Sequence, residues 1–337
     1  MSFKRLDAED FIVSADSITN TLWSDSVPTL ATFYTSSTQA AGSSGNYYLS
    51  VFQTASQDST AAVQFDLAFG NLNGSGSIPF NSGIINRSPT STIYGQYRTM
   101  VLGDENADFT FGDFSSDEFV ALPIERARYK EGLFPGSLNL TLTTNGIDFI
   151  HITDNSNDVA SITFVDGGRQ FELVSGSNGS AYTGTGYTPA SGSYGWMLPD
   201  IGVLLLNTKA LEGTVAQGGI SLPITRTNTT NGDTNAAVYD AIVDGAAFAL
   251  NSQETITSDF IFVRARNAEF NYSENPSYIS GSTGDVIYPE FINSPQSYIT
   301  TVGMYNDTND LLAVAKLSKP LLKDFTKETL VRVKLDF

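Results

Sequence analysis

The chain contains a single histidine, His151, so any mechanism that needs an imidazole has one candidate. His151 lies in IDFIHITD, where strand geometry places it on the same face as Ile147 and Phe149. A general base of the triad type also needs a nucleophile and an orienting acid positioned by the fold. The sequence has no Gly-x-Ser-x-Gly turn and no cysteine. This favours a half-buried strand histidine over a catalytic base.

Carboxylates offer the other possible chemistry. Asp154-Asn155-Ser156-Asn157-Asp158 has the oxygen spacing that begins a calcium loop, but the sixth position is not glycine and the twelfth is not glutamate. The neighbouring pairs Asp104-Glu105 and Asp117-Glu118 lie in polar segments, whereas a glycosidase needs two carboxylates at a separation set by the fold. No Gly-Lys pair exists for a phosphate-binding loop. We therefore expect no catalytic residues, no metal site and no cofactor, and we expect that the protein is not an enzyme.

Composition narrows the class of protein. Charged residues are 16% of the 337, against about 25% in typical globular proteins, so the surface is expected to be rich in uncharged polar groups. The formal net charge is −18, which disfavours binding to nucleic acid. The N-terminus lacks the apolar core of a signal peptide, and the longest apolar run, near 202–206, is far too short to cross a membrane. We expect no nucleic-acid partner and no membrane partner.

Short runs rich in β-branched and aromatic residues, each bounded by Gly, Ser, Asn or Asp, dominate the chain. These runs predict a mainly β protein with a minor α component, built from antiparallel β-sandwich or sheet domains. The examples are TLATFYTSS, NYYLSVFQT, AAVQFDLAF, SLNLTLTT, IDFIHITD, ASITFVD, QFELVSG, FIFVRARNAEF, YITTVGMYN and LVRVKLDF.

Two segments interrupt this pattern and predict short isolated helices. In the first, about 89–102, Ser88 can cap, Pro89 suits the first turn and Gly103 suits the end. In the second, about 235–244, Ala237, Val238, Ala241 and Ile242 share one face and Gly245 follows.

Glycine-rich and serine-rich stretches at 71–89 and 175–200 are expected to be long loops between elements. We expect three parts. Residues 1–145 are expected to form a β-rich domain with one helix, and residues 146–295 a β-rich domain with the loop 175–200 and the second helix. Residues 296–337 are expected to form a C-terminal hairpin-plus-strand module. The loop 175–200 is expected to become ordered only on a partner, because it buries little apolar area.

The C-terminal module has the clearest pattern. Residues 297–305 and 311–319 are expected to form an antiparallel hairpin closed by 306–310, with Pro320 ending the second strand. A terminal strand is expected to lie beside it, with one apolar face that can join a neighbouring subunit. The residues of that face are Val331, Val333, Leu335 and Phe337.

The terminal sequence SYITTVGMYNDTNDLLAVAKLSKP, with FKRLDAEDF, SPTSTIYGQYR and IERARYKEGLFPGSLNLTL upstream, resembles structural proteins in the virions of large contractile-tailed bacteriophages. The resemblance implies a non-enzymatic component of the tail or baseplate, whose partners are copies of itself and other phage structural proteins. It implies localisation in the virion, after assembly in the host cytoplasm, and brings no catalytic residues.

Two further groups of residues are candidates for interfaces. The basic cluster Arg126, Arg128 and Lys130 has acidic neighbours and suits an ion-pair contact between subunits, although a solvated turn fits the same residues. The aromatic residues Tyr187, Tyr194 and Trp196 suit either a protein contact or stacking on a sugar. The second possibility leaves open an alternative function, a tail fibre or decoration protein that binds a receptor or glycan on the host surface.

Overall fold

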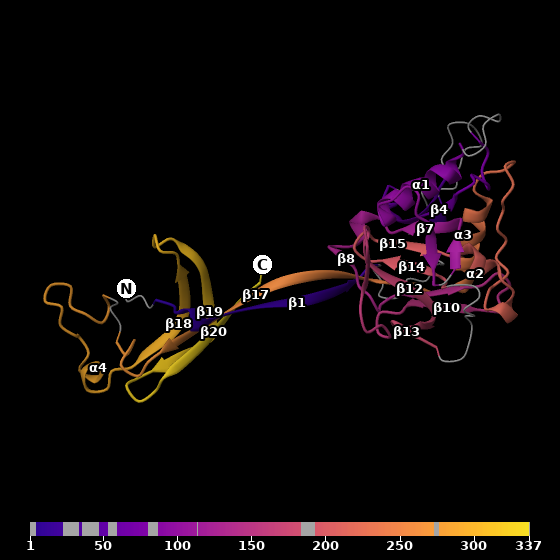
Figure 1. The fold of residues 1–337 in the computed structure, drawn as a ribbon. Coiled ribbons are helices and arrows are strands. Elements are labelled where there is room, and N and C mark those ends of the chain that lie inside the picture. The colour runs from indigo at the N-terminus through magenta and orange to yellow at the C-terminus, as the bar shows by residue number, and fades with distance from the viewer. Residues whose placement is uncertain are drawn as a thin grey trace. The chain divides into compact units, whose positions relative to one another are not determined.

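The structure is a computed structural model, and it describes residues 5–22, 34–35, 47–52, 59–79, 87–112, 114–182, 193–272 and 276–336. The described chain is mainly antiparallel β, which confirms the predicted fold class. It divides into two compact units (Figure 1). Unit 1 comprises Met1–Ser17 and Thr255–Phe337, and unit 2 comprises Ile18–Glu254.

Unit 2 is built around one large sheet with the strand order β16-β9-β10-β12-β14-β15-β7-β4-β3-β2, to which β11 and β13 are added along β12. The strands of this sheet are β2 (Tyr34–Thr35), β3 (Leu49–Phe52), β4 (Val63–Asn71), β7 (Glu118–Pro123), β9 (Asn139–Leu142), β10 (Ile150–Asp154), β11 (Thr163–Val165), β12 (Gly168–Ser177), β13 (Ser180–Ala181), β14 (Gly195–Leu198), β15 (Val203–Leu206) and β16 (Phe248–Ala249). Outside it, β5 (Phe109–Phe111) and β6 (Phe114–Ser116) form a small hairpin.

The central strands of this sheet are buried on both faces. All residues of β14 and β15 are buried, as are Glu118–Leu122 of β7. Alternate side chains enter two separate cores: Leu204 and Leu206 join one, and Val203 and Leu205 join the other. A sheet covered on both faces explains why these strands read as continuous apolar runs instead of alternating ones.

Helix α1 (Pro89–Leu102) lies over one face of the sheet and begins and ends where its sequence predicts. The backbone N–H of Ser88 donates to Oγ of Ser91 at 3.2 Å, and the Ser88 hydroxyl donates to the carbonyl of Gly74 at 2.6 Å. At the other end Gly103 has φ of 68°, a left-handed conformation that suits glycine. Buried Tyr94 and Val101 join the core that includes Trp196.

Helix α3 (Asp233–Gly245) belongs to the other core and extends the predicted range by two residues at its start. Val238, Ala241 and Ile242 are buried as predicted. Gly245 lies so close to β9 that an added Cβ would come 1.9 Å from the carbonyl oxygen of Thr141, so a larger residue would push the helix off the sheet. A third, short helix of this unit, α2 (Thr208–Glu212), was not predicted.

The predicted domain boundaries are wrong. A boundary at 145 would separate β9 from β10. These two strands pair directly, with Leu140 opposite Ile152 and Leu142 opposite Ile150. The Gly- and Ser-rich stretch 175–200 does not separate domains, because β12 and β14 on either side of it pair directly. The predicted loop 175–200 is wrong at both ends, because residues up to 177 belong to β12 and residues 195–198 form the central strand β14. Residues 183–192 lie outside the described residues.

Unit 1 contains a sheet with the order β1-β17-β20 and a separate hairpin, β18-β19. Their bounds are Phe11–Thr21 for β1, Asn251–Ala265 for β17, Ser297–Tyr305 for β18, Leu311–Lys323 for β19 and Thr329–Asp336 for β20. The short β8 (Gly132–Leu133) also pairs with β17, and the short helix α4 covers Pro289–Asn293. The boundary between the units falls within β1 and within β17.

The hairpin is present as predicted, but two details differ. Pro320 does not end β19; the strand continues to Lys323, and the pairing jumps from Thr301–Lys316 to Ile299–Leu321. Pro320 has no N–H for the ladder and falls within this irregular stretch. The terminal strand β20 is hydrogen-bonded to β17, not to the hairpin, over Ser258–Ala265. The hairpin instead packs against the face of that sheet.

Candidate assembly interface

The terminal strand β20 has the alternation that the sequence predicts. Val331 and Val333 are buried and Leu335 is half-buried, whereas Arg332 and Lys334 between them are exposed. These apolar residues pack with Ile261 of β17 under the inner face of the hairpin. Phe337 lies outside the described residues. The predicted interface face of β20 is therefore used inside the subunit, because the hairpin covers it.

The inner face of the hairpin contributes Val302, Met304, Ala315, Leu317 and Leu321 to this small core. Lys323 at the end of β19 is fully buried, and its ammonium donates to the carbonyls of Asn267 and Asp324 and to Oδ1 of Asn271 at 2.7–3.1 Å. These bonds hold the end of the hairpin to the chain that follows β17. The hairpin thus has a fixed orientation within unit 1.

The outer face of the hairpin is apolar and exposed. Across the ladder Gly303 faces Val314, and Tyr305 faces Leu311. The exposed fractions are 39% for Tyr305, 53% for Leu311, 68% for Leu312 and 56% for Val314. These exposed apolar residues are neighbours at the tip of the hairpin. We call these four residues the outer hairpin patch.

The turn at the tip of the hairpin is rigid. Oδ1 of Asn306 accepts hydrogen bonds from the backbone N–H groups of Thr308 and Asp310 and from the Thr308 hydroxyl, at 2.7–3.1 Å. Asn309 has φ of 66°, which asparagine tolerates. Bonds from the side chains of Thr308 and Asn306 lower the pKa of Asp310. This satisfied network confirms the interpretation of 306–310 as a polar turn.

Strand β1, whose residues up to Ser17 belong to unit 1, also exposes apolar residues. Only Ser14 among its residues is even partly covered. Phe11, Ile12 and Val13 are 42%, 53% and 58% exposed, although consecutive residues of a strand point to opposite faces. The described residues therefore leave apolar side chains exposed on both faces of β1.

The basic cluster lies on a short 3-10 helix, Arg126–Arg128, in unit 2. Arg126 is exposed, and its guanidinium donates to the carbonyl of Tyr129 at 2.7 Å and lies 4.7 Å from the centroid of that ring. Arg128 is half-buried, and Lys130 is exposed. None of the three forms an ion pair with a described residue, so a role at a subunit contact stays a prediction.

The aromatic residues expected at the surface are core residues. Tyr194 and Trp196 are 1% and 4% exposed. The Tyr194 hydroxyl donates to the carbonyl of Gly218 at 2.6 Å, and Trp196 packs edge-on against Phe109 and Phe111. Neither ring is open to a sugar or a partner, because β14 is central in its sheet. Tyr187 lies outside the described residues.

Trp196 also belongs to a polar cluster that the sequence does not reveal. Its indole N–H donates to Oε1 of Glu172 at 3.0 Å, and the Ser193 hydroxyl donates to Oε2 of the same carboxyl. Burial raises the pKa of Glu172, although these hydrogen bonds oppose the rise. The pairing of β12 with β14 places Glu172 opposite Trp196 and so forms this cluster.

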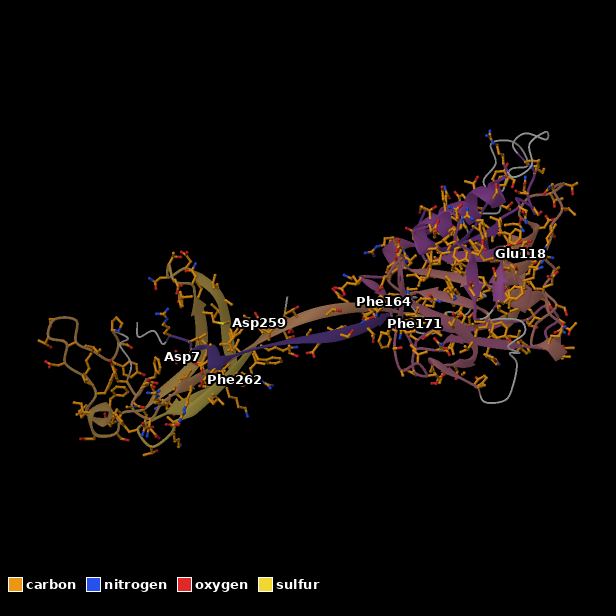
Figure 2. The ribbon with its side chains drawn as sticks, viewed as in Figure 1. Asp7, Glu118, Phe164, Phe171, Asp259 and Phe262 are labelled. Atoms are coloured by element: carbon orange, nitrogen blue, oxygen red, sulfur yellow. The ribbon has the colours of Figure 1, made fainter. Side chains whose placement is uncertain are left out.

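Glu118, one of the paired carboxylates noted in the sequence and labelled in Figure 2, is buried and is the centre of an ion network. Nε of Arg226 donates to Oε2 at 2.9 Å, Asn71 donates to Oε2 at 3.0 Å and Thr208 donates to Oε1 at 3.0 Å. Arg226 also bonds both oxygens of Glu212 at 2.7–2.8 Å. Every oxygen of Glu118 is satisfied, which is the arrangement of a structural anchor between β7, α2 and the segment before α3.

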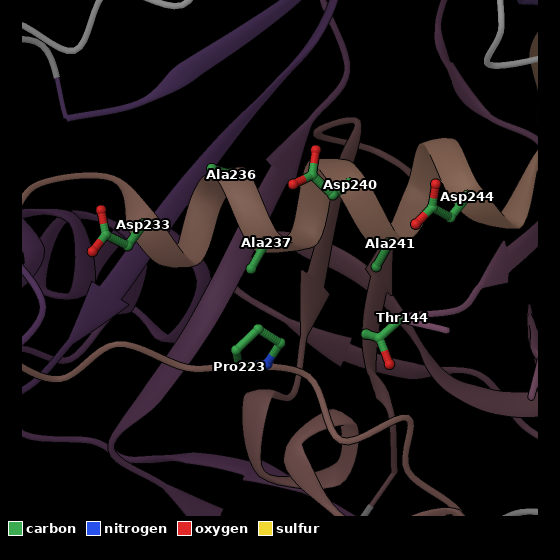
Figure 3. A pocket seen from close by; sticks show the side chains of 8 residues that line it. All are labelled: Thr144, Pro223, Asp233, Ala236, Ala237, Asp240, Ala241 and Asp244. Carbon is green, nitrogen blue, oxygen red and sulfur yellow. The ribbon is translucent and has the colours of Figure 1, made fainter. Parts of the chain in front are cut away.

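A shallow pocket of about 470 Å³ lies beside α3, lined in part by Asp233, Asp240 and Asp244 (Figure 3). Burial, and then the charge of Asp244, raise the pKa of Asp240. Within the described part of the chain no group of three or more His, Asp or Glu residues is arranged to hold a metal ion. The pocket is an acidic surface groove without a chelating geometry.

The remaining candidates are accounted for by local structure. His151 on β10 is exposed and its Nδ1 is 3.0 Å from Oγ1 of Thr141, with no carboxylate among its described partners. Asp154 is fully buried, and its carboxylate accepts from the backbone N–H groups of Gly136 and Ser156 at 2.9–3.1 Å. The calcium-like sequence is therefore a turn closed by Asp154.

Comparison with known proteins gives no relative: no family model, no curated protein and no solved structure matches the chain. Among the described residues no helix is long and apolar enough to span a membrane.

Proposed function

We propose that the chain is a non-enzymatic structural component of a bacteriophage virion, placed in the tail or baseplate, that acts through contacts between subunits of a symmetric assembly. The observation that carries the proposal is the surface of unit 1. There, the only buried apolar side chains among the described residues are Ile261, Ala265, Val331 and Val333, while β1 and β19 expose apolar residues.

Elementary stability arguments support this assignment. A two-stranded ribbon is marginally stable in water, and small units gain too little from their own cores. The outer hairpin patch would add about 1.5–3 kcal/mol per large side chain on full burial. Symmetric assembly repeats such contacts around an axis, so that modest single contacts become a stable particle. Other copies of the chain and other structural proteins of the virion are the proposed partners.

The attribution to a phage tail is supported by the resemblance of the segments at both ends and in the middle of the chain. The acidic excess supports a partner that is not nucleic acid. The alternative, a glycan-binding fibre or decoration protein, relies on exposed aromatic rings within residues 182–196. Tyr194 and Trp196 are buried, Tyr182 is 44% exposed, and Tyr187 lies outside the described residues, so this alternative has less support.

The test has two arms. Light scattering of the purified full chain should show oligomers that grow with concentration. Antibodies against the chain should label the tails of phage particles produced from a genome that encodes it. A protein that stays monomeric at all concentrations, with no label on particles, would overturn the proposal.

A further inference from the structure

The buried lysine at the end of the hairpin has an unusual set of partners. The ammonium of Lys323 donates to the carbonyls of Asn267 and Asp324 at 3.1 and 2.9 Å. It also donates to Oδ1 of Asn271 at 2.7 Å. All three acceptors are neutral, and Lys323 forms no ion pair with a described residue, whereas a fully buried lysine is normally paired with a carboxylate. An amine that is removed from water among neutral groups is suited to act as a nucleophile.

The group beside this amine is a carboxamide, whose carbon an amine can attack. Asn271 is buried, and its Nδ2 donates to the carbonyl of Asn267 at 2.6 Å. The same carbonyl accepts from Nζ of Lys323. One oxygen therefore holds both the nitrogen that would bond to Cγ of Asn271 and the nitrogen that would leave it. Groups held together in this way react as if at a very high concentration, about 10⁵–10⁸ M in well-oriented cases.

The base of the hairpin fixes this geometry, although the two residues are 52 positions apart in the chain. Phe270, next to Asn271, has φ of 52°, a conformation that a bulky residue adopts only where its surroundings hold it. The hydroxyl of Ser297, at the start of β18, donates to the carbonyl of Phe270. Ser297 in turn lies opposite Lys323 in the ladder. Both strands of the hairpin thus hold the turn that presents Asn271 to the amine.

We propose that Lys323 and Asn271 form an intramolecular isopeptide bond, a modification that the folded protein makes on itself. The neutral amine attacks Cγ of Asn271, the bond from Nζ to Cγ forms, and the bond from Cγ to Nδ2 breaks. Nδ2 leaves as ammonia and takes up the proton that the lysine ammonium gave up. The carboxylates of Asp324 and Glu328 lie within electrostatic reach of Lys323 and can carry that proton. An ammonium and a carboxamide thus become a secondary amide and an ammonium ion, and no oxidant or cofactor is needed.

The bond compensates for the small core of unit 1. It closes a covalent loop that contains β18 and β19, so the hairpin stays tied to the chain that follows β17. Such a loop restricts the unfolded chain as a disulfide does, in a sequence that has no cysteine. It also replaces a buried positive charge, which is costly to keep away from water, by a neutral amide. The inference concerns this single chain and does not depend on the proposed assembly.

Mass spectrometry of the purified full chain tests the bond directly. The intact parent chain should be lighter than its sequence by one ammonia molecule. Trypsin should release a branched peptide that joins 267–316 to 317–327, because it does not cut after an acylated Lys323. Lys323→Arg keeps the positive charge and N–H donors but has no amine, so the branched peptide should be absent. Lys319→Arg, at an exposed lysine of the same strand, is the matched control and should keep the branched peptide.

Two results would overturn the proposal. The first is a parent chain of undiminished mass that trypsin cuts after Lys323. The second is a loss of ammonia without the branched peptide, because the Asn-Gly pairs of this chain can also lose ammonia by cyclising on their own backbone. Circular dichroism checks that Lys323→Arg folds, and the peptides of the parent chain decide the question even where that variant does not. Either result leaves the proposed function standing, because assembly does not require the bond.

Discussion

Strands β15 and β1 both carry apolar runs but use them differently. Val203–Leu206 of β15 lies in the middle of the large sheet of unit 2, and all four residues are buried. Phe11–Val13 of β1 in unit 1 is 42–58% exposed. The free energy that β15 gains on folding is available to β1 only when another molecule covers it. Unit 2 thus buries its apolar strands within its own fold, whereas unit 1 leaves part of its apolar surface exposed.

The largest difference between the two units is expected when the terminal strand is removed, because only unit 1 should lose its structure. Deleting residues 331–337 takes away the ladder partner of β17 and the cover of Ile261. We expect unit 1 to lose its protection in hydrogen exchange measured by mass spectrometry, while β7, β14 and β15 stay protected. Leu330→Ala, at a 63% exposed side chain, is the control and should change neither unit. Equal loss of protection in both units would show that they fold as one.

A core substitution should affect unit 2 next most strongly. Phe119 is fully buried, with ring centroids 4.9 Å from Phe109 and 5.4 Å from Tyr94. Phe119→Ala should lower the free energy of unfolding by about 3–5 kcal/mol in urea denaturation. Phe325→Ala, at a 57% exposed ring of unit 1, should cost less than about 0.5 kcal/mol. Similar costs at the two sites would contradict the contrast between the units.

The Glu118 network should give unit 2 a sensitivity to acid. Burial tends to raise the pKa of Glu118, but the hydrogen bonds and charge of Arg226, with Lys209 and Thr208, outweigh burial and hold the pKa below its ordinary value of 4.5. The stabilisation is therefore present above the ordinary pKa and is lost as the pH falls through the lowered pKa.

Glu118→Gln should consequently destabilise the protein at pH 7 by about 1.5–3 kcal/mol, because the charge-assisted bonds from Arg226 weaken while its pair with Glu212 remains. Urea denaturation between pH 7 and pH 3 should show a smaller fall in stability for the variant than for the parent chain. Glu328→Gln, which removes an exposed ion pair with Arg264, is the control. If the free energy of unfolding of the variant fell with pH as steeply as that of the parent chain, other carboxylates would be responsible for the acid sensitivity.

The smallest effect on stability, but a large effect on assembly, is expected at the outer hairpin patch. Leu312→Ser changes a side chain that is 68% exposed and should alter the unfolding free energy of unassembled protein by less than about 0.5 kcal/mol. Light scattering should nevertheless show weaker association. Leu317→Ser on the inner face should destabilise unit 1 itself. Association unaffected by Leu312→Ser would remove this patch from the interface.

Local sequence patterns were sufficient to predict the elements whose geometry depends on residues close together in the chain. The caps of α1, the apolar face of α3, the Asn306–Asp310 turn and the alternation of β20 depend on neighbouring residues, so their types specify the geometry. The same holds for the interpretation of Asp154–Asp158 as a turn. The mainly β character follows from many such local patterns acting together.

Long-range pairing was decided only by the tertiary structure. The four apolar residues of β14 follow a Gly- and Ser-rich stretch, and only the ladders to β12 and β15 make them a central strand. Arg226 meets Glu118 across 108 positions of the chain, which no local pattern encodes. Likewise, the sequence determined that Val331, Val333 and Leu335 share a face, but only the fold decided that β17 and the hairpin cover it, because burial depends on which surfaces meet in space.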